Sequence, residues 1–240
     1  QTVCWDVTNP LCPFRQPMDY GSGNASFGIA EARERYFHLF EPAGVKQVAS
    51  LYRIPNQNLH AITDVNMLII TPRVFWDQSE ALATFHRVND GMNCLVVDVQ
   101  EIYNEFATGA MDPTAVRDFI RMVYLRSQGN LKYVLFMGKG SHDYRDIKGM
   151  HRNFVPTYEI ASYPFDEVSS MCSDDYFALM DQEEGQNCDG MVDIGLGRIP
   201  ITTPEQGDAV VAKIKHYADL SAKHGIWKNN HILMADNDTR

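Results

Sequence analysis

CLVVDV (residues 94–99) and YVLFM (residues 133–137) enclose the stretch of sequence that decides the fold. Both runs are short and apolar, which is typical of buried strands. Between them, Asp112-Pro113 supplies a helix N-cap and a proline in the first helical turn. Apolar side chains then recur at helical spacing, at Val116, Phe119, Ile120, Val123 and Tyr124. A strand, a helix and a second strand in this order predict a βαβ unit of a mostly parallel sheet.

The alternation of strands and helices continues on both sides of this stretch. MLII (residues 67–70) is a further buried strand, and Thr203-Pro204 begins a helix with a capping residue and a first-turn proline. Additional strands are predicted at residues 176–180, 192–196 and 231–235. The segment 138–173 is too long for a turn, and loops of this length are usually functional. Residues 61–240 are therefore predicted to form an α/β unit, incomplete at its C-terminus because no helix follows the last strand.

Residues 1–60 differ in character, with many Pro, Gly and Asn residues. Short β-like runs at residues 2–7 and 35–40 are separated by turn signals such as Asn9-Pro10, which predicts a β-rich region. The first five residues, QTVCW, resemble the middle of a strand. We therefore expect residues 1–60 to be the end of a preceding β-rich region, in a chain that starts inside a longer protein.

The composition is that of an ordinary globular protein, with 45% hydrophobic residues. The 31 acidic and 21 basic residues give a formal net charge of -10. This balance disfavours nucleic acid as a partner, because such partners need clustered Lys and Arg. No apolar run reaches the ~18 residues of a membrane span, and the N-terminus lacks a signal-peptide pattern.

The five cysteines do not form a metal-binding motif, because there is no C-x-x-C pair and no His cluster at ligand spacing. Their spacing allows disulfides between Cys4 and Cys12 and between Cys172 and Cys188, and it equally allows free thiols. Cys94 opens an apolar run and is predicted to be a buried thiol that behaves as a small hydrophobic residue.

GKGS (residues 138–141) follows a predicted strand, as a phosphate loop would. It lacks the leading glycine of that motif and the Ser or Thr directly after the lysine. We therefore interpret these glycines as a sharp turn. Asp143, with His142, Tyr144 and Asp146 beside it, could hold a cation or contact substrate, and a solvated polar loop is the simpler interpretation.

Two pairs of carboxylates are candidate site residues. Asp174 and Asp175 stand at the start of a predicted strand, where successive side chains point to opposite faces, so they cannot share a proton; one of them could contact substrate or a cation. Asp236 and Asp238 follow the last predicted strand, where a carboxylate could orient a catalytic histidine. An acidic loop is the alternative. Arg198 could bind an anion or pair with an aspartate of the same sheet.

Five segments carry a family resemblance: IPNQNLH (54–60), EIYNEF (101–106), DPTAVRDF (112–119), SDDYF (173–177) and DIGLGRIP (193–200). Together they resemble the gingipain-type cysteine peptidases, and among these the sortases of the type IX secretion system. The resemblance covers residues 50–240. It implies a caspase-like α/β catalytic domain of two subdomains, of which this chain is the first.

The resemblance also implies acyl transfer by a cysteine and a histidine of the second subdomain, beyond Arg240; none of the five cysteines here matches the nucleophile. The thiolate attacks the scissile carbonyl, the histidine protonates the leaving amine, and backbone N–H groups stabilise the oxyanion. The implied partners are cargo proteins with a C-terminal sorting domain, an anionic lipopolysaccharide as acyl acceptor, other surface components of the secretion system and the second subdomain. The implied location is the bacterial outer membrane surface or the extracellular space. No cofactor is required, and the sequence does not support a structural Ca2+.

In gingipains an acidic residue just after the corresponding strand supports the histidine. By position this role falls to Asp238, with Asp236 as the neighbour that a short register shift would select. The chain departs from its relatives at GKG (138–140), where Gly-Asp-Gly is expected, so a contact made by that aspartate is not implied here. The main alternative is a non-enzymatic binding or scaffold module of the same fold. A nucleotide-binding protein is disfavoured by the failed phosphate-loop match.

Overall fold

The computed structural model describes residues 2–30, 33–160, 171–185, 188–219, 225 and 229–233. The chain divides into two compact units, Gln1–Pro55 and Asn56–Arg240. Among the described residues, no helix is both long and apolar enough to cross a membrane.

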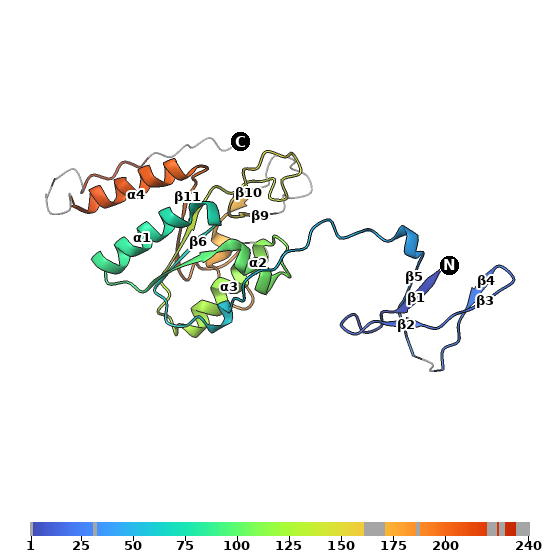
Figure 1. Ribbon diagram of the computed structural model, residues 1–240. Helices are drawn as coiled ribbons and strands as arrows, with labels where there is room; N and C mark the ends of the chain where they lie inside the picture. The colour runs from blue at the N-terminus through green and yellow to red at the C-terminus, as the bar shows by residue number, and fades with distance from the viewer. Residues whose placement is uncertain are drawn as a thin grey trace, which may run out of the picture. The chain divides into compact units, whose positions relative to one another are not determined.

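The first unit is built from short antiparallel strands (Figure 1). Its elements are β1 (Val3–Asp6), β2 (Phe14–Gln16), β3 (Asp19–Gly21), β4 (Asn24–Ser26), β5 (Phe37–Phe40) and the 3-10 turn η1 (Pro42–Gly44). β1 lies between β2 and β5, and β3 pairs with β4 in a hairpin. The two strands predicted here, at residues 2–7 and 35–40, contain β1 and β5.

The second unit has the predicted α/β architecture. Its elements are η2 (Leu59–Ala61), β6 (Met67–Thr71), η3 (Arg73–Phe75), α1 (Trp76–Asn89), β7 (Cys94–Asp98), α2 (Val99–Phe106), α3 (Pro113–Arg126), β8 (Tyr133–Met137), β9 (Tyr158–Ile160), β10 (Met171–Ser173), η4 (Asp175–Ala178), β11 (Gly195–Ile199) and α4 (Pro204–Asp219). The central sheet has the strand order β11-β8-β6-β7 and is parallel throughout, while β9 and β10 form a separate antiparallel pair.

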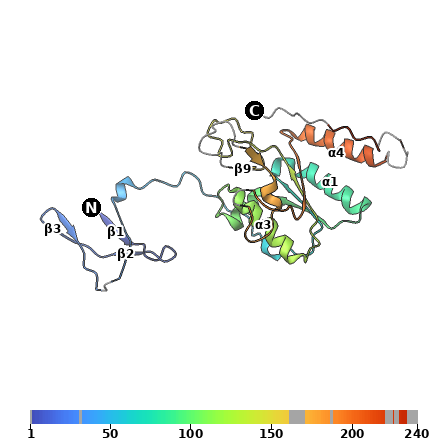
Figure 2. The same cartoon turned by 180° about the vertical axis from the view of Figure 1, so that it is seen from behind.

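Helices cover both faces of the central sheet, α1 and α4 on one side and α2 and α3 on the other (Figures 1 and 2). Side chains of β6 alternate between the two layers: Leu68 and Ile70 pack in the core that contains α2 and α3, and Met67 and Ile69 pack in the core that contains α1. Burial on both faces explains why this strand is apolar from Met67 to Ile70 instead of alternating with polar residues.

The strand predicted at 176–180 is wrong, and the strand predicted at 192–196 is found with shifted bounds. Residues 175–178 form the 3-10 helix η4, and the strand predicted at 192–196 begins only at Gly195. Asp193 accounts for the shift, because its backbone N–H donates to the Ala178 carbonyl at 3.0 Å and its carboxylate accepts from the Met180 N–H at 2.8 Å. These bonds hold the chain beside the end of η4 before it enters the sheet. Val192 remains outside the sheet and is 51% exposed.

The strand predicted at 231–235 is not found in its described part. Residues 231–233 have no strand pairing, and the side chains of Ile232 and Leu233 are exposed. Residues 234 and 235 lie outside the described residues.

Two helices were missed. α1 has no capping side chain at Phe75, and Gln78 and Ser79 are buried in its core-facing stripe, so the local signals of a helix are weak. α2 begins directly after β7, with Asp98 as its N-cap accepting from the Gln100 N–H at 2.9 Å. The predicted strand at 94–99 therefore ends one residue earlier, at Asp98.

The Glu105 carboxylate anchors residues 57–60 to α2. It accepts hydrogen bonds from the Gln57 side chain at 3.0 Å, from the Leu59 N–H at 2.7 Å and from His60 Nδ1 at 2.6 Å. Burial raises the pKa of Glu105, but the hydrogen bonds from Leu59, Gln57 and His60 together outweigh it and lower the pKa to about 2. The charged form of Glu105 is therefore the one that holds the start of this unit in place.

We expect Glu105→Gln to lower the free energy of unfolding by about 1–2 kcal/mol at neutral pH, because the charge-assisted hydrogen bonds are lost. The folded-state pKa lies below the ordinary value of 4.5, so the stabilisation is present above that pH and disappears as the pH falls toward 2. Urea unfolding across this pH range should show the two proteins converging in acid. An equal difference at every pH would contradict the assignment, and the exposed Glu183→Gln serves as the control.

Candidate functional site

The carboxyl edge of the parallel sheet is the candidate site, because ligands of parallel α/β folds bind beyond the carboxyl ends of the strands. β8 ends at Met137 and continues into Gly138, and Arg198 is the penultimate residue of the neighbouring β11. The loop that leaves β8 and the pair β9–β10 lie next to this edge (Figure 1).

Gly138 makes the sharp turn that the sequence predicted. Its φ is +142°, and a Cβ at this position would lie 2.9 Å from the Cβ of Phe154. Its N–H donates to the Ile199 carbonyl at 2.9 Å, which ties the turn to the end of β11. The loop returns at Phe154, whose N–H donates to the Lys139 carbonyl at 2.9 Å. A larger residue at 138 would push these segments apart.

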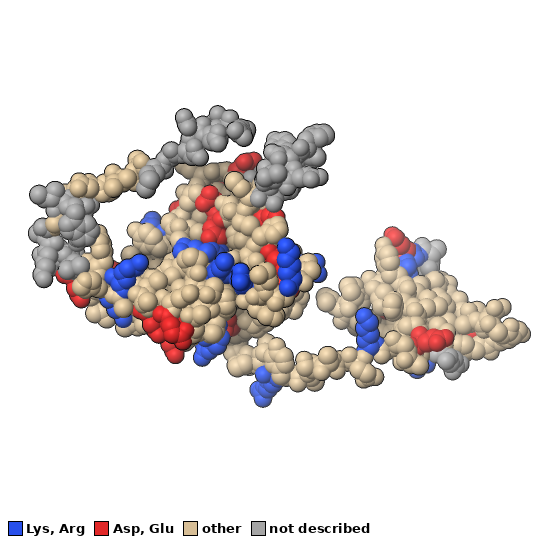
Figure 3. Space-filling view, turned by 90° about the horizontal axis from the view of Figure 1, so that it is seen from above, with Lys and Arg blue, Asp and Glu red and all other residues tan. Residues whose placement is uncertain are grey.

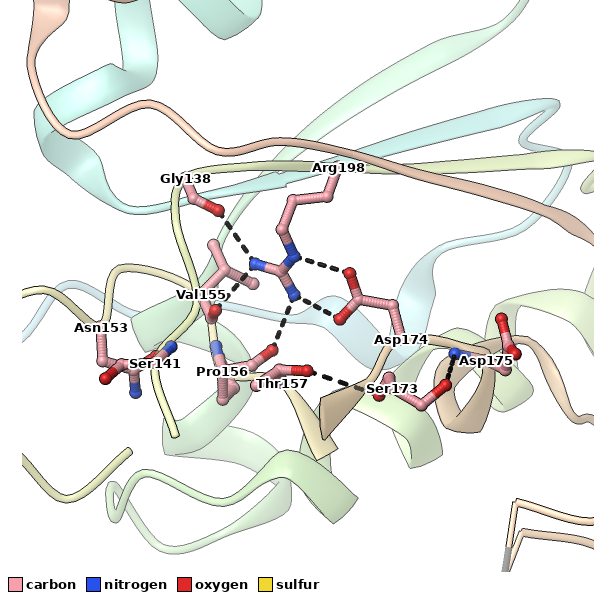
Figure 4. Close-up of polar contacts among 10 residues, drawn as sticks. All are labelled: Gly138, Ser141, Asn153, Val155, Pro156, Thr157, Ser173, Asp174, Asp175 and Arg198. Carbon is pink, nitrogen blue, oxygen red and sulfur yellow. Dashed lines mark hydrogen bonds and ion pairs between the residues drawn. The ribbon is translucent and has the colours of Figure 1, made fainter. Parts of the chain in front are cut away.

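Arg198 joins four segments at this edge (Figure 4). Its Nε and Nη2 donate to the two carboxylate oxygens of Asp174, each at 2.7 Å. The remaining N–H groups donate to three backbone carbonyls, Gly138 at 2.9 Å, Val155 at 2.8 Å and Pro156 at 2.9 Å. The guanidinium also lies over the ring of Phe136 at 4.8 Å.

These contacts use all five N–H donors of the guanidinium. The ion-pair interpretation of Arg198 is therefore confirmed, and the anion-binding alternative is excluded because the side chain keeps no donor for an anion. The partner Asp174 does not belong to the central sheet but follows β10 directly. We call Arg198, Asp174 and the three carbonyls the Arg198 hub.

Asp174 and Asp175 do not begin a strand as predicted. β10 ends at Ser173, Asp174 has helical φ and ψ, and Asp175 starts η4 with its N–H donating to the Ser173 hydroxyl at 3.1 Å. The Asp174 carboxylate faces Arg198, whereas Asp175 lies beyond Ser173 and is exposed (Figure 4). Asp174 thus has a structural role in the hub, and a contact with substrate stays a prediction for Asp175.

Asp143 organises its own loop. Its carboxylate accepts from the N–H groups of Ile147 at 2.9 Å and Lys148 at 2.7 Å. These backbone hydrogen bonds, that from Lys148 first, lower the pKa of Asp143. Among the described residues, no three His, Cys, Asp or Glu side chains gather as a metal site would require.

The buried hydroxyl of Tyr103 is a polar group that sequence reasoning missed. The residue is 3% exposed, and its hydroxyl has no hydrogen-bond partner among the described residues. Burial raises the pKa of Tyr103, and the negative charge of Asp112 adds to this effect. No motif marks Tyr103, because its burial results from the packing of α2 against α3.

Four of the five thiols do not have the properties of a nucleophile. All five cysteines are free, so neither disulfide that the spacing allowed is formed. Cys94 is 3% exposed as predicted, and burial raises its pKa to about 11. Burial also raises the pKa of Cys4, Cys172 and Cys188, whereas a catalytic thiol needs a lowered pKa. The candidate acids Asp236 and Asp238 lie outside the described residues.

Residues 60–240 match the model of peptidase family C25. The chain belongs to this family. C25 is the gingipain family of cysteine peptidases, so the match agrees with the resemblance found in the five sequence segments. None of the curated proteins matches the chain.

A similar fold is seen in a solved structure, the crystal structure of dimeric latent PorU from Porphyromonas gingivalis. The similarity has a TM-score of 0.75 at 24% sequence identity and covers 96% of this chain. It covers 23% of the PorU chain, so the sequence spans less than a quarter of that protein's length. At this level of identity the comparison establishes the caspase-like α/β fold.

Proposed function

We propose that this chain is the first subdomain of the catalytic domain of a C25 sortase. The whole protein would cleave the C-terminal sorting signals of type IX secreted cargo and transfer the new carboxyl end to an anionic lipopolysaccharide at the outer membrane surface. The match to the C25 family over residues 60–240 carries this proposal. The sortase role, the cargo and the acceptor rest on the resemblance of the five sequence segments.

In the proposed reaction, the cysteine of the second subdomain attacks the scissile carbonyl as a thiolate. The C–N bond breaks when the histidine gives a proton to the leaving amine, and a thioester remains on the enzyme. An amine of the acceptor then attacks the thioester, loses its proton to the histidine and releases the thiolate. Water in place of this amine gives hydrolysis.

The described chain contributes the framework of this site. The Arg198 hub fixes the loop after β8 against the end of β11, at the edge where catalytic groups of parallel α/β folds gather. Asp238 is the proposed histidine-orienting residue, and Asp236 is its alternative. The four thiols with raised pKa values support a nucleophile elsewhere in the protein.

The test uses the full-length protein with a cargo protein that carries a sorting signal and with the purified lipopolysaccharide. The expected product is cargo that has lost its signal and gained the mass of the acceptor, and alkylation of the catalytic cysteine should abolish it. Cleavage of the cargo without transfer to the lipopolysaccharide would show that the protein is a peptidase and not a sortase. Absence of both reactions in folded protein would favour the non-enzymatic scaffold.

A further inference from the structure

The loop of residues 139–152 is basic within an acidic chain. Its four basic residues, Lys139, Arg145, Lys148 and Arg152, outnumber its two acidic ones, although the whole chain has a net charge of -10. On the face drawn in Figure 3, Lys and Arg side chains of the second unit lie beside Asp and Glu side chains. Recognition of an anion by this unit would therefore depend on a local cluster such as this loop.

The two acids of the loop are used by the loop itself. Asp143 accepts from the N–H groups of Ile147 and Lys148, as described above. Asp146 accepts from the His151 N–H at 2.8 Å and pairs with His151 Nδ1 at 2.6 Å. Both carboxylates are therefore directed at backbone or histidine N–H groups, and neither forms an ion pair with a Lys or Arg side chain within the described residues, although the charge of Lys148 contributes to the lowered pKa of Asp143.

The cations of the loop face solvent. Arg145, Lys148 and Arg152 are exposed, and none of them forms an ion pair within the part of the chain that the structure describes. Exposed cations held on a loop with a fixed turn structure can contact several phosphates of one ligand at little cost in loop ordering.

A pocket of about 280 Å³ lies within this loop. Tyr144 and Ile147 supply apolar surface, Arg145 and Lys148 contribute cations, and His142 at the wall pairs with Glu159 at 2.9 Å. The carboxylates of Asp143 and Glu159 complete the lining. A sugar ring can pack on such apolar surface while its phosphate groups contact the cations. A neutral glycan would have no charged groups to pair with these cations.

The loop is attached to the candidate site. It begins directly after Gly138, whose carbonyl accepts from Arg198. Just after its other end, the Asn153 side chain donates to the Tyr144 carbonyl at 2.9 Å, which ties the pocket residues to the returning segment of the chain. The loop that carries this pocket therefore starts at the carboxyl edge of the sheet, where the acyl group is proposed to be transferred.

We propose that the loop of residues 139–152 is the docking surface for the phosphate-bearing glycan of the acyl acceptor. This inference rests on the proposed function, since it names the place where that function's acceptor binds. Arg145, Lys148 and Arg152 bind the phosphates, and the pocket beside Tyr144 receives a sugar ring.

The experiment uses the full-length protein and the triple variant Arg145→Gln, Lys148→Gln, Arg152→Gln. The matched control is Lys132→Gln, Lys213→Gln, Lys215→Gln, which removes the same charge from other parts of the second unit. Phosphorylated dextran is the probe and neutral dextran its reference. At about 0.1 M salt, we expect the triple variant to bind phosphorylated dextran about 10- to 100-fold more weakly than the wild type, and the control to bind within about 3-fold.

Binding and catalysis separate the two proposals. We expect the triple variant to transfer cargo to the lipopolysaccharide at least about 10-fold more slowly than the wild type does. Equal binding by the triple variant and the control would overturn the docking surface. Complete displacement of the dextran by inorganic phosphate at equal phosphate concentration, or tighter binding of an acidic peptide to the loop, would overturn it as well. Failure of the wild type to cleave cargo would instead contradict the sortase function, with the binding result unaffected.

Discussion

Replacing Arg198 with methionine is expected to lower the free energy of unfolding of the α/β unit by about 3–5 kcal/mol. The substitution leaves the Asp174 carboxylate without its two charge-assisted hydrogen bonds, and it leaves the carbonyls of Gly138, Val155 and Pro156 without a donor. The Arg198 side chain is only 13% exposed, so water replaces these bonds poorly. Urea unfolding followed by circular dichroism gives the difference.

Two further variants and one control make this expectation specific to the hub. Arg198→Lys keeps the charge but lacks the planar fork, so it should recover less than half of the loss. The double variant Arg198→Met, Asp174→Leu should be more stable than Arg198→Met alone, because no uncompensated carboxylate remains. Arg152→Met, on the exposed loop, should change stability by less than about 0.5 kcal/mol. A loss below about 1 kcal/mol for Arg198→Met would show that the hub does not hold the edge together.

The elements that could be predicted from the sequence are those with local signals. β6 is apolar from Met67 to Ile70 and β8 from Val134 to Met137 because both faces of the sheet are covered, and this pattern needs no knowledge of partners. α3 begins where Asp112 and Pro113 predicted, with the Asp112 carboxylate accepting from the Thr114 N–H at 2.8 Å. Capping and periodicity act within a few residues, so the sequence alone reveals them.

The elements that were predicted wrongly or with shifted bounds depend on distant partners. The apolar residues of η4 are buried by α3 and β8, among them Phe177 against Phe136, and burial alone does not distinguish a strand from a 3-10 helix. β11 contains two glycines, and its pairing with β8 is what makes it a strand. The start of β11 is set by the contact of Asp193 with Ala178 and Met180, which no periodicity contains.

The candidate site shows the same limit. Asp174 and Arg198 could be selected from the sequence as candidate site residues. Their pairing could not be predicted, because they are 24 positions apart in the chain. Their pairing requires the loop after β8 and the β9–β10 pair to fold back onto the end of β11. Tyr103 gave no signal at all, since a buried hydroxyl becomes apparent only when its surroundings are known.

The largest effect on catalysis is expected from Asp238→Asn in the full-length protein, which should lower kcat on cargo about 10³-fold. A carboxylate that accepts from the histidine N–H fixes the tautomer that can take and return a proton, and it stabilises the imidazolium that forms. An asparagine at this position has the same shape but can present its NH2 group, which favours the wrong tautomer. KM should change little, because a positioning residue of this kind does not touch the cargo.

Asp236→Asn is the matched comparison, because it removes the same charge two residues away. If Asp238 is the residue that orients the histidine, Asp236→Asn should keep kcat within about 3-fold of the wild type. A large loss of kcat in Asp236→Asn, with Asp238→Asn close to the wild type, would assign this role to Asp236. Thermal unfolding of both variants separates a positioning role from a structural one, since only the latter lowers the midpoint along with kcat. If both variants keep full kcat, the histidine is oriented by a group outside this chain. The first subdomain would then contribute the Arg198 hub and the loop of residues 139–152 to the site, but no residue in contact with the catalytic pair.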